Sequence, residues 1–377
     1  MNRKDLLERF GDSLRGVESK KEQTTKKIEY VSTYLREWAR VMCGYNKVDT
    51  LVFVDCMCNA GIYDDGDLGT ISRACALFCE LAPRYPNKHF QLYANDKNAD
   101  RVRTCSAICQ EIIKEAGNPK NVELITAEMD VEEYLPRIGE VERLKKIETA
   151  LLLFADPYNA RVSLSLLTDF LMTHYCEVIY NCFTSDVRRN VDDPVIAEKL
   201  GVKLQKGQSI DPIVERGLRV NKIHHVFSYS FRIRNGAELY KIYFATPNIK
   251  GLEKLKDALW KVFGGNLYHQ NTKVDTQAGE QLSLFGQSEN EEMNASTFAV
   301  DACHLIERDY AGKLFSYDEI ERVLLERTML RKGQIVSLVL KPMVKDARLI
   351  KCNRNVSPQN YKKDFFRVPE SNDREAL

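Results

Sequence analysis

The chain has 377 residues, of which 44% are hydrophobic and 29% are charged, and its formal net charge is +1. This composition is that of an ordinary globular protein and excludes disordered and fibrous classes. A chain of this length exceeds one ordinary hydrophobic core, so two domains are expected. The near-neutral charge excludes nucleic-acid or membrane binding through overall electrostatics, so any such binding must come from a local basic surface.

Several features predict a soluble, cytoplasmic protein. No apolar run approaches the roughly 18–20 residues that a membrane span needs. The first residues, MNRKDLLERFGDSLRG, are charged and lack the apolar segment of a secretion signal. The 11 cysteines form an odd number, which in a chain without such a signal favours reduced thiols over a disulfide framework.

The first expected element is an amphipathic helix over 24–43, where apolar residues recur at spacings of three and four. Short apolar runs then alternate with helical stretches, which is typical of a parallel sheet covered by helices on both faces. The five strands expected in this region cover 51–56, 90–96, 121–130, 148–159 and 176–183.

Two further strands are expected at 225–234 and 238–247, and a helix at 251–263 closes the domain. Only residues 235–237 connect the two strands, and so short a connection permits only antiparallel pairing. A parallel sheet that ends in an antiparallel hairpin is the class I methyltransferase variant of the Rossmann-type α/β fold. We therefore predict such a domain over 1–264.

The rest of the chain is expected to form a linker and a second, smaller domain. Residues 265–295 are polar, and between Asn266 and Ala295 one Lys stands against one Asp and four Glu, which predicts an acidic flexible linker. Residues 296–377 show three helical patterns followed by a strand-like segment. This order predicts a winged-helix domain.

The loop after the first strand is the first candidate for a cofactor site. Asp55 ends the strand, and Asn59 and Gly61 follow in the sequence DCMCNAG. A nucleotide-like ligand lies beyond the carboxyl ends of such strands, where the backbone must approach it closely and glycine leaves room. The alternative is an ordinary turn, because the loop lacks a full G-x-G.

Acidic residues also follow the second and third strands. Asp96 is placed to accept hydrogen bonds from ribose hydroxyls, and Asp130 is placed to bind an adenine amino group. Each could instead cap the helix that follows it. Together with the loop after the first strand, these positions predict a pocket for S-adenosylmethionine (SAM).

The fourth strand ends in Asp156-Pro157-Tyr158, where methyltransferases place the substrate. The carboxylate can accept hydrogen bonds from an exocyclic amine while the aromatic ring stacks on a base. These three residues are therefore the candidate catalytic residues. The alternative is a rigid turn, in which proline is common.

The chain resembles the three-Cys-motif partner family, bacterial and phage-borne proteins with a methyltransferase-like fold that associate with a radical-SAM protein carrying three cysteines. The resemblance covers nearly the whole chain in the right order. It rests on Thr25, Lys26, Tyr34 and Trp38 of the first helix and on VFVDCMCNAGIYDDGDLGT, FADPYN, VIYNCF and YFATPNIKGLEKLKDALWKV. It implies SAM as cofactor, a radical-SAM partner protein, and a role in phage–host conflict or in DNA modification and repair.

The chain departs from the family pattern at two places in the expected site. Asn59 replaces the first loop glycine; asparagine tolerates a positive φ better than other side-chain-bearing residues, but its side chain could intrude on SAM. The family sequence D-P-F-G is D-P-Y-N here. Two interpretations therefore stay open: an active nucleobase methyltransferase, and a degenerate, non-catalytic fold that binds DNA or the radical-SAM partner.

Two segments outside the first domain are candidates for binding partners. In the linker, Gln281, Leu282, Leu284 and Phe285 resemble a peptide that binds the bacterial sliding clamp, although exposed apolar residues can also dock on their own chain. Between Arg331 and Arg367, ten Lys or Arg residues stand against two acids, which suits contacts with DNA more than RNA. The nucleic-acid candidates are Arg331, Lys332, Lys341, Lys345, Arg348 and Arg354. Winged helices also dock proteins.

Four cysteines form two helical pairs, Cys75 with Cys79 and Cys105 with Cys109. Each pair lies on one face of its helix, and the two helices are expected on the same side of the sheet. We interpret the thiols as small buried hydrophobes and predict no metal site, because loop-type C-x2-C spacing is missing.

Overall fold

The computed structural model describes residues 15–157, 162–271, 287–352 and 361–369. Tyr158, the linker candidates Gln281, Leu282, Leu284 and Phe285, and Arg354 lie outside the described residues. The chain divides into two compact units: unit 1 comprises Met1–Gly251 and Tyr268–Lys273, and unit 2 comprises Leu252–Leu267 and Val274–Leu377. Each unit is described by itself.

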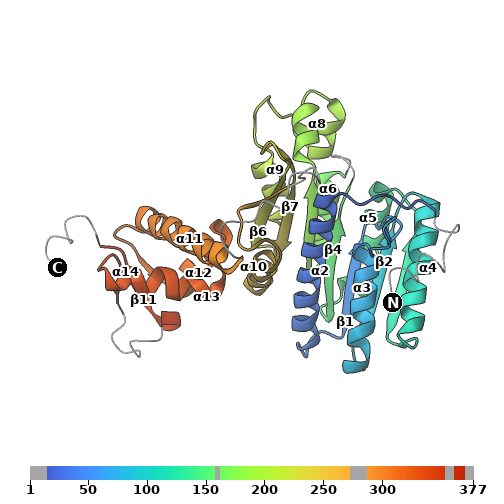
Figure 1. Cartoon of the computed structure of the whole chain (residues 1–377), viewed down its shortest axis with the longest axis horizontal. Coiled ribbons are helices and arrows are strands. Elements are labelled where there is room, and N and C mark those ends of the chain that lie inside the picture. The colour runs from blue at the N-terminus through green and yellow to red at the C-terminus, as the bar shows by residue number, and fades with distance from the viewer. Residues whose placement is uncertain (1–14, 158–161, 272–286, 353–360, 370–377) are drawn as a thin grey trace. The chain divides into compact units, whose positions relative to one another are not determined.

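Unit 1 is built on an eight-stranded sheet with the order β3-β2-β1-β4-β5-β7-β6-β8 (Figure 1). Neighbouring strands among the first five pair in parallel. They are β1 (Thr50–Asp55), β2 (His89–Asn95), β3 (Val122–Ala127), β4 (Thr149–Ala155) and β5 (Cys176–Cys182). The five strands expected from the short apolar runs are therefore confirmed, and β1, β4 and β5 are buried almost throughout.

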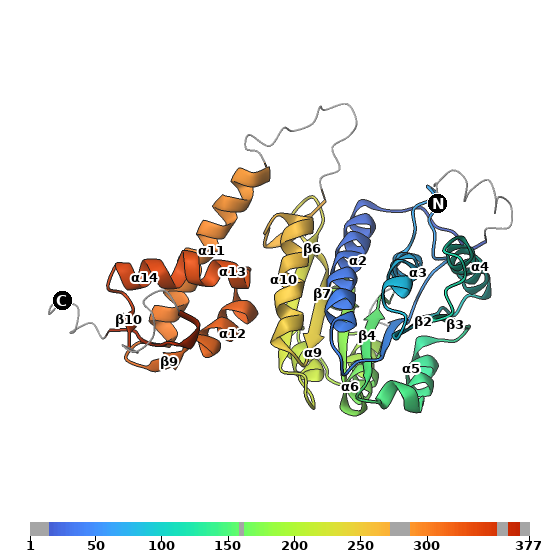
Figure 2. The ribbon, with the colours of Figure 1, turned by 90° about the horizontal axis from the view of Figure 1, so that it is seen from below.

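Helices cover both faces of the sheet, as the alternation of elements predicted (Figure 2). One face carries α2 (Glu22–Cys43), α3 (Thr70–Leu81) and α4 (Ala99–Glu115). The other carries α5 (Val131–Gly139), α6 (Leu164–Thr173), α8 (Pro194–Leu200) and α9 (Asp211–Leu218). Short helical segments lie at η2 (Ala82–Arg84), η3 (Glu142–Lys145) and α7 (Thr184–Arg189). The apolar stripe of α2 is buried as expected.

The hairpin of β6 (His225–Arg232) and β7 (Glu238–Thr246) is antiparallel, as predicted, and β7 also pairs antiparallel with β5. The expectation that the hairpin forms the sheet edge is wrong. A short strand, β8 (Tyr268–Gln270), pairs in parallel with β6 and lies outside it. This strand falls within the segment 265–295, whose polar composition concealed its pairing with β6.

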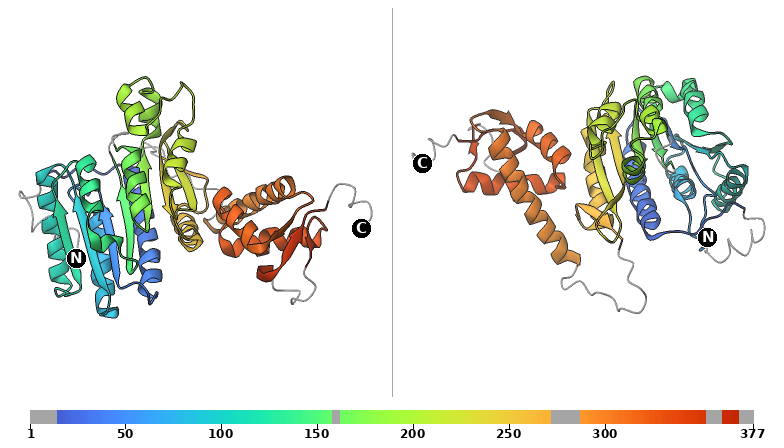
Figure 3. Two further views of the ribbon diagram at one scale, coloured as in Figure 1. Left: turned by 180° about the vertical axis from the view of Figure 1, so that it is seen from behind. Right: turned by 90° about the horizontal axis from the view of Figure 1, so that it is seen from above.

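Unit 2 combines helices with a three-stranded antiparallel sheet of order β10-β11-β9 (orange to red in Figure 3). Its helical segments are α10 (Ile249–Phe263), α11 (Gln287–Asp309), α12 (Tyr317–Arg327), and the consecutive α13 (Lys332–Gln334), η4 (Ile335–Leu340) and α14 (Lys341–Lys345). Its strands are β9 (Leu314–Ser316), β10 (Ile350–Lys351) and β11 (Phe365–Arg367), with η5 (Tyr361–Lys363) before the last.

Most of helix α10, expected to close the first domain, belongs to unit 2. Its Trp260 Nε1 donates a hydrogen bond to the carbonyl of Met329 at 2.7 Å, and Lys256 Nζ donates to the carbonyl of Thr328 at 2.6 Å. Among the described residues, no helix is both long and apolar enough to cross a membrane.

Candidate functional site

The carboxyl ends of β1 to β4 meet at one edge of the unit 1 sheet, and two cavities lie there. The smaller has a volume of about 330 Å³, and the larger about 560 Å³. Met57 and Pro157 line both. Of the predicted site residues, the smaller cavity is lined by Asp55, Asn59, Gly61, Asp156 and Pro157, and the larger by Asp96, Asp130 and Pro157. The strand-end residues singled out in the sequence are thus brought to one edge.

The loop between β1 and α3 is held in a conformation that needs two unusual residues. Asn59 has a φ of 54°, and Gly61 has a φ of 69°. A Cβ on Gly61 would come within 2.7 Å of Ser72 Oγ, so a larger residue would have to displace its neighbour. Asn59 thus takes the positive φ expected of its type. Its side chain donates a hydrogen bond to Glu18 at 3.3 Å and accepts one from Ala60 N at 2.7 Å.

Asp55 is almost completely buried, with 1% of its surface exposed. Burial, reinforced by the nearby carboxylates of Asp156 and Asp96, holds the pKa of the Asp55 carboxyl well above its usual range, although a hydrogen bond from Met57 N opposes this. A buried carboxyl group beside other carboxylates favours a positively charged ligand or a proton, because either relieves the repulsion.

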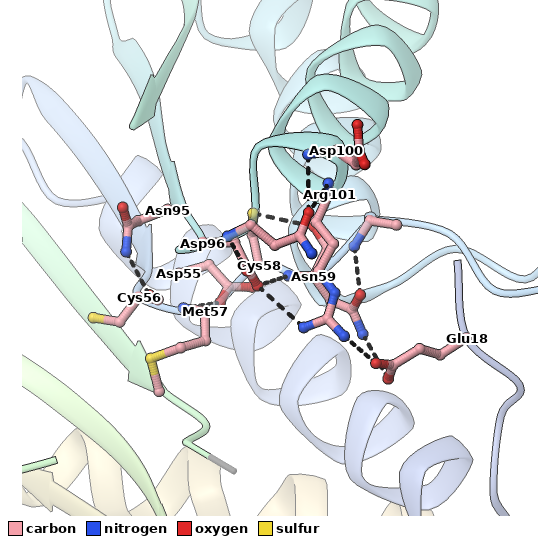
Figure 4. A network of polar contacts seen from close by, with 12 residues as sticks. Glu18, Asp55, Cys56, Met57, Cys58, Asn59, Asn95, Asp96, Asp100 and Arg101 are labelled. Carbon is pink, nitrogen blue, oxygen red and sulfur yellow. Dashed lines mark hydrogen bonds and ion pairs between the residues drawn. The ribbon is translucent and has the colours of Figure 1, made fainter. Parts of the chain in front are cut away.

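Asp96 does not cap the helix that follows it; Asn98 does, accepting hydrogen bonds from the first turn of α4. The Asp96 carboxylate accepts hydrogen bonds from Asn59 N at 3.2 Å and Asn98 N at 3.0 Å (Figure 4). Arg101 lies 3.8 Å from the same carboxylate and also pairs with Glu18. Asp96 therefore ties the loop after β1 to the start of α4.

Asp130 caps α5 by accepting a hydrogen bond from Glu132 N at 3.0 Å, as the alternative interpretation of this residue predicted. It lines the larger cavity as well. Next to it, Glu132 accepts hydrogen bonds from Ser163 and from Lys199 of α8, the latter at 2.9 Å. The wall of this cavity is therefore shared between the ends of β2, β3 and β4 and the α7–α8 region.

Both carboxylate oxygens of Asp156 have partners inside the protein. Lys27 of α2 forms an ion pair with one oxygen, and Asn181 of β5 donates a hydrogen bond to the other at 2.6 Å. Lys27 is 8% exposed and its Nζ lies 5.7 Å from the centre of the Tyr240 ring. The Oδ1 atom of Asn181 is buried and has no hydrogen-bond partner among the described residues.

Sequence reasoning missed Lys27, Arg101 and Asn181. A signal existed for two of them. Lys27 lies one helical turn before Val31 on the apolar face of its helix, and Asn181 interrupts an apolar strand. Arg101 had no comparable signal, because arginine is ordinary in the first turns of an exposed helix face.

The smaller cavity also has aromatic walls, formed by Tyr63, Phe154, Phe183 and Tyr240. A cavity with aromatic walls and a few converging polar groups is typical of sites for planar organic ligands.

In unit 2, three of the predicted nucleic-acid contacts have internal partners. Arg331 stacks over the ring of Trp260 at 4.8 Å. Lys332 pairs with Glu253 at 2.7 Å and with Glu321 at 3.1 Å. Arg348 makes two 2.9 Å hydrogen bonds to Glu307. By contrast, Lys341 and Lys345 are exposed. Within the described ranges, no group of three or more His, Cys, Asp or Glu side chains could hold a metal ion.

The strand order and the cavities at the carboxyl edge define a mixed α/β protein with a Rossmann-like, methyltransferase-type sheet. The sequence matches no protein-family model and no curated protein, so the resemblance to the three-Cys-motif partner family stays a prediction.

The solved structures that resemble this chain include methyltransferases. One is an O-methyltransferase family protein from Burkholderia thailandensis, 10% identical, with 65% of this chain and 68% of that chain covered and a TM-score of 0.27. Another is Trm1 from Pyrococcus horikoshii in complex with SAM, 12% identical, with 63% and 59% covered and a TM-score of 0.35. A third is the METTL16 methyltransferase domain, 11% identical, with 66% and 98% covered and a TM-score of 0.29. All three TM-scores are below 0.5, and the fold class rests on the strand order of the sheet.

Proposed function

We propose that this protein is a SAM-dependent methyltransferase that acts on a nucleobase. The observation that carries the proposal is the pair of adjoining cavities at the carboxyl edge of the sheet, which share Met57 and Pro157 and are lined by the acidic residues of four strand ends. In sheets of this type, ligands bind outside the carboxyl ends of the strands.

The residues present fit SAM by their chemistry. The larger cavity offers Met57, Met129 and Val131 as apolar surface and Asp130 as an acceptor, which suits an adenosine group. The buried Asp55 in the smaller cavity suits a positively charged group. SAM would supply an activated methyl group at this edge.

The aromatic walls of the smaller cavity and Asp156 support a nucleobase as substrate. Bases stack on aromatic rings with little dependence on sequence, and a carboxylate can accept a hydrogen bond from an exocyclic amine. Asn181 helps to position this carboxylate by donating a hydrogen bond to its other oxygen at 2.6 Å. In this proposal, the amine of the base shares Asp156 with Lys27.

Unit 2 supports binding of a nucleic acid, DNA in our proposal. The order from α11 to β11, in which a helix and a strand are followed by further helical segments and two short strands, supports our proposal of a winged helix. Lys341 and Lys345, the first and last residues of α14, are exposed, and we propose that they contact phosphates.

A second function is favoured by a specific observation: Asp96 and Asp156 already have internal partners for their carboxylates. Such a site suits a non-catalytic subunit that binds DNA or a radical-SAM partner, in DNA modification, repair or phage defence. A contact with the sliding clamp through Gln281–Phe285 belongs to this proposal.

Calorimetry of the full chain with SAM separates the two functions. Binding tighter than about 1 mM, equivalent to about 4 kcal/mol, supports the enzyme, and its absence leaves the non-catalytic subunit. Asp130→Ala should weaken SAM binding about tenfold, because an adenine contact of roughly 1.4 kcal/mol is lost. The matched control is Asn98→Ala. This change also removes a helix N-cap in unit 1, but Asn98 lines neither cavity. Equal SAM affinity of the two variants would contradict the assigned role of Asp130.

A further inference from the structure

The proposed function gives Lys27 no role of its own, although this lysine stands at the wall of the smaller cavity. It lies on the buried face of α2 and is 8% exposed. Lys27 and Asp156 both line the cavity, so their ion pair is part of its wall. Replacing a buried ion pair by apolar residues is often neutral for stability. Packing alone therefore does not require a lysine at this position.

The ion pair is held from three elements of unit 1. Asn181 of β5 donates a hydrogen bond to the other carboxylate oxygen of Asp156 at 2.6 Å. The Nζ atom of Lys27 lies 5.7 Å from the centre of the Tyr240 ring on β7. This ring packs against Phe183, with 5.4 Å between the ring centres, and both aromatic residues line the cavity. The ammonium group and the carboxylate are therefore fixed side by side, next to an aromatic surface.

The ion pair combines a hydrogen-bond donor with a neighbouring acceptor. A lysine ammonium group has three N–H donors and no acceptor, and a carboxylate has about four acceptor sites. The contact between Lys27 and Asp156 uses one donor and one acceptor site, and the hydrogen bond from Asn181 uses a second acceptor site. These contacts do not exhaust either group, so a ligand in the cavity can bind to both at once.

We propose that Lys27 selects the base, by donating a hydrogen bond to the ring nitrogen beside the exocyclic amine that is bound to Asp156. This inference rests on the proposed function, because it assigns the edge of the substrate that the same site reads. An extruded base is read by hydrogen bonds to its Watson–Crick edge. On that edge, adenine has N1 beside its amine and cytosine has N3, and both of these ring nitrogens are acceptors.

The other two bases of DNA do not match this pair of groups. On the Watson–Crick edge of guanine, the ring nitrogen beside the amine carries a hydrogen and would face the Lys27 ammonium group donor to donor. Such a mismatch disfavours the wrong ligand. Thymine has no exocyclic amine for Asp156. The substrate class is therefore a base with an amine next to an unprotonated ring nitrogen, namely adenine or cytosine.

The test measures binding of short single-stranded DNA to the full chain by fluorescence anisotropy, without SAM. The oligonucleotides contain only thymine except at the centre, where they carry adenine, cytosine or guanine. The adenine or the cytosine form should bind about tenfold more tightly than the guanine form, because one hydrogen bond to a charged group is gained. The corresponding 1-deazaadenine or 3-deazacytosine form, which lacks the ring acceptor, should lose this preference. The 7-deazaadenine form keeps N1 and should bind like adenine.

Variants assign the effect to the lysine. Lys27→Met removes the ammonium group from a side chain of similar length and should bind the natural base and its deaza form equally. Lys27→Arg keeps a charged donor and should retain most of the preference. The matched control is Lys26→Met on the same helix, because Lys26 pairs with Glu29 at 2.9 Å and lines neither cavity. This control should keep the preference of the parent protein.

Equal binding of the adenine, cytosine and guanine forms by the parent protein would overturn the proposal, as would a preference that persists in folded Lys27→Met. The deaza comparison is made in the parent protein, so an unchanged affinity there overturns the proposal even where Lys27→Met does not fold. Because the mixture contains no SAM, a failure to bind SAM would sink the proposed enzyme function without changing these affinities.

Discussion

At the carboxyl edge of unit 1, the acidic residues singled out in the sequence line two cavities, whereas in unit 2 several of the basic residues singled out are joined to acidic side chains of their own unit. Asp96 and Asp156 exemplify the first case, and Lys332 and Arg348 the second. The difference teaches that position relative to a strand end is more informative than local charge. Parallel pairing forces strand ends together, but a count of basic residues does not reveal their partners.

The largest loss of stability is expected for Lys332→Ala, which tests whether this basic residue is needed by its acidic neighbours. Lys332→Ala leaves Glu253 and Glu321, each 6% exposed, next to each other without their shared cation. Removing one partner from such a group costs about 4 kcal/mol of unfolding free energy, which urea denaturation followed by circular dichroism would measure. The control Lys341→Ala removes an exposed lysine and should change the stability by less than about 0.5 kcal/mol. Equal stability of the two variants would show that Lys332 is free for nucleic acid.

A slightly smaller loss is expected in unit 1 for Asp156→Ala. The change leaves the ammonium group of Lys27 buried without its carboxylate, at a cost of about 3 kcal/mol. Glu80→Ala is the matched control, because the Arg36–Glu80 pair is 39% exposed on both sides and should contribute at most about 1 kcal/mol. If both variants lose the same stability, the Lys27–Asp156 pair is not a structural ion pair, and Asp156 is held for a ligand alone.

Glu177 of unit 1 differs from the acidic residues above, because hydroxyl groups hold this buried carboxyl group. Tyr34 and Thr246 donate hydrogen bonds to it. Burial raises its pKa from 4.5 to about 7. A raised pKa in the folded state stabilises the protein below the unfolded pKa, and this stability is lost as the pH rises through about 7. Glu177→Gln should abolish this dependence and be more stable than the parent above pH 7, by about 2 kcal/mol. Parallel stability curves of the two proteins between pH 5 and 8 would contradict it.

The smallest effect concerns the DNA binding that we propose for unit 2. Lys341→Ala and Lys345→Ala should each weaken binding several-fold and reduce the slope of log affinity against log salt by about 0.9 for each lost phosphate contact. Lys120→Ala, an exposed lysine of unit 1, is the control and should leave the slope unchanged. If all three variants behave alike, unit 2 docks a protein. These substitutions are a more specific test than deletion of 296–377. The deletion would also remove the carbonyl groups of Thr328 and Met329, which accept hydrogen bonds from α10.

Much of the fold could be predicted from the sequence. The apolar runs at 51–56 and 176–183 predict buried parallel strands because their length and pattern leave few alternatives, and the short 235–237 connection permits only a hairpin. The positive φ of Asn59 was also expected from its residue type. These features depend on neighbours within a few residues, so local sequence determines them.

Tertiary structure alone decided the partners of the site residues. Lys27 and Asp156 lie 129 positions apart, and Glu18 and Arg101 lie 83 apart. The placement of β8 beside β6 and of most of α10 in unit 2 likewise depends on which surfaces meet. The physical reason is that periodicity determines which face of an element is buried, whereas the partner buried against it depends on how distant segments pack.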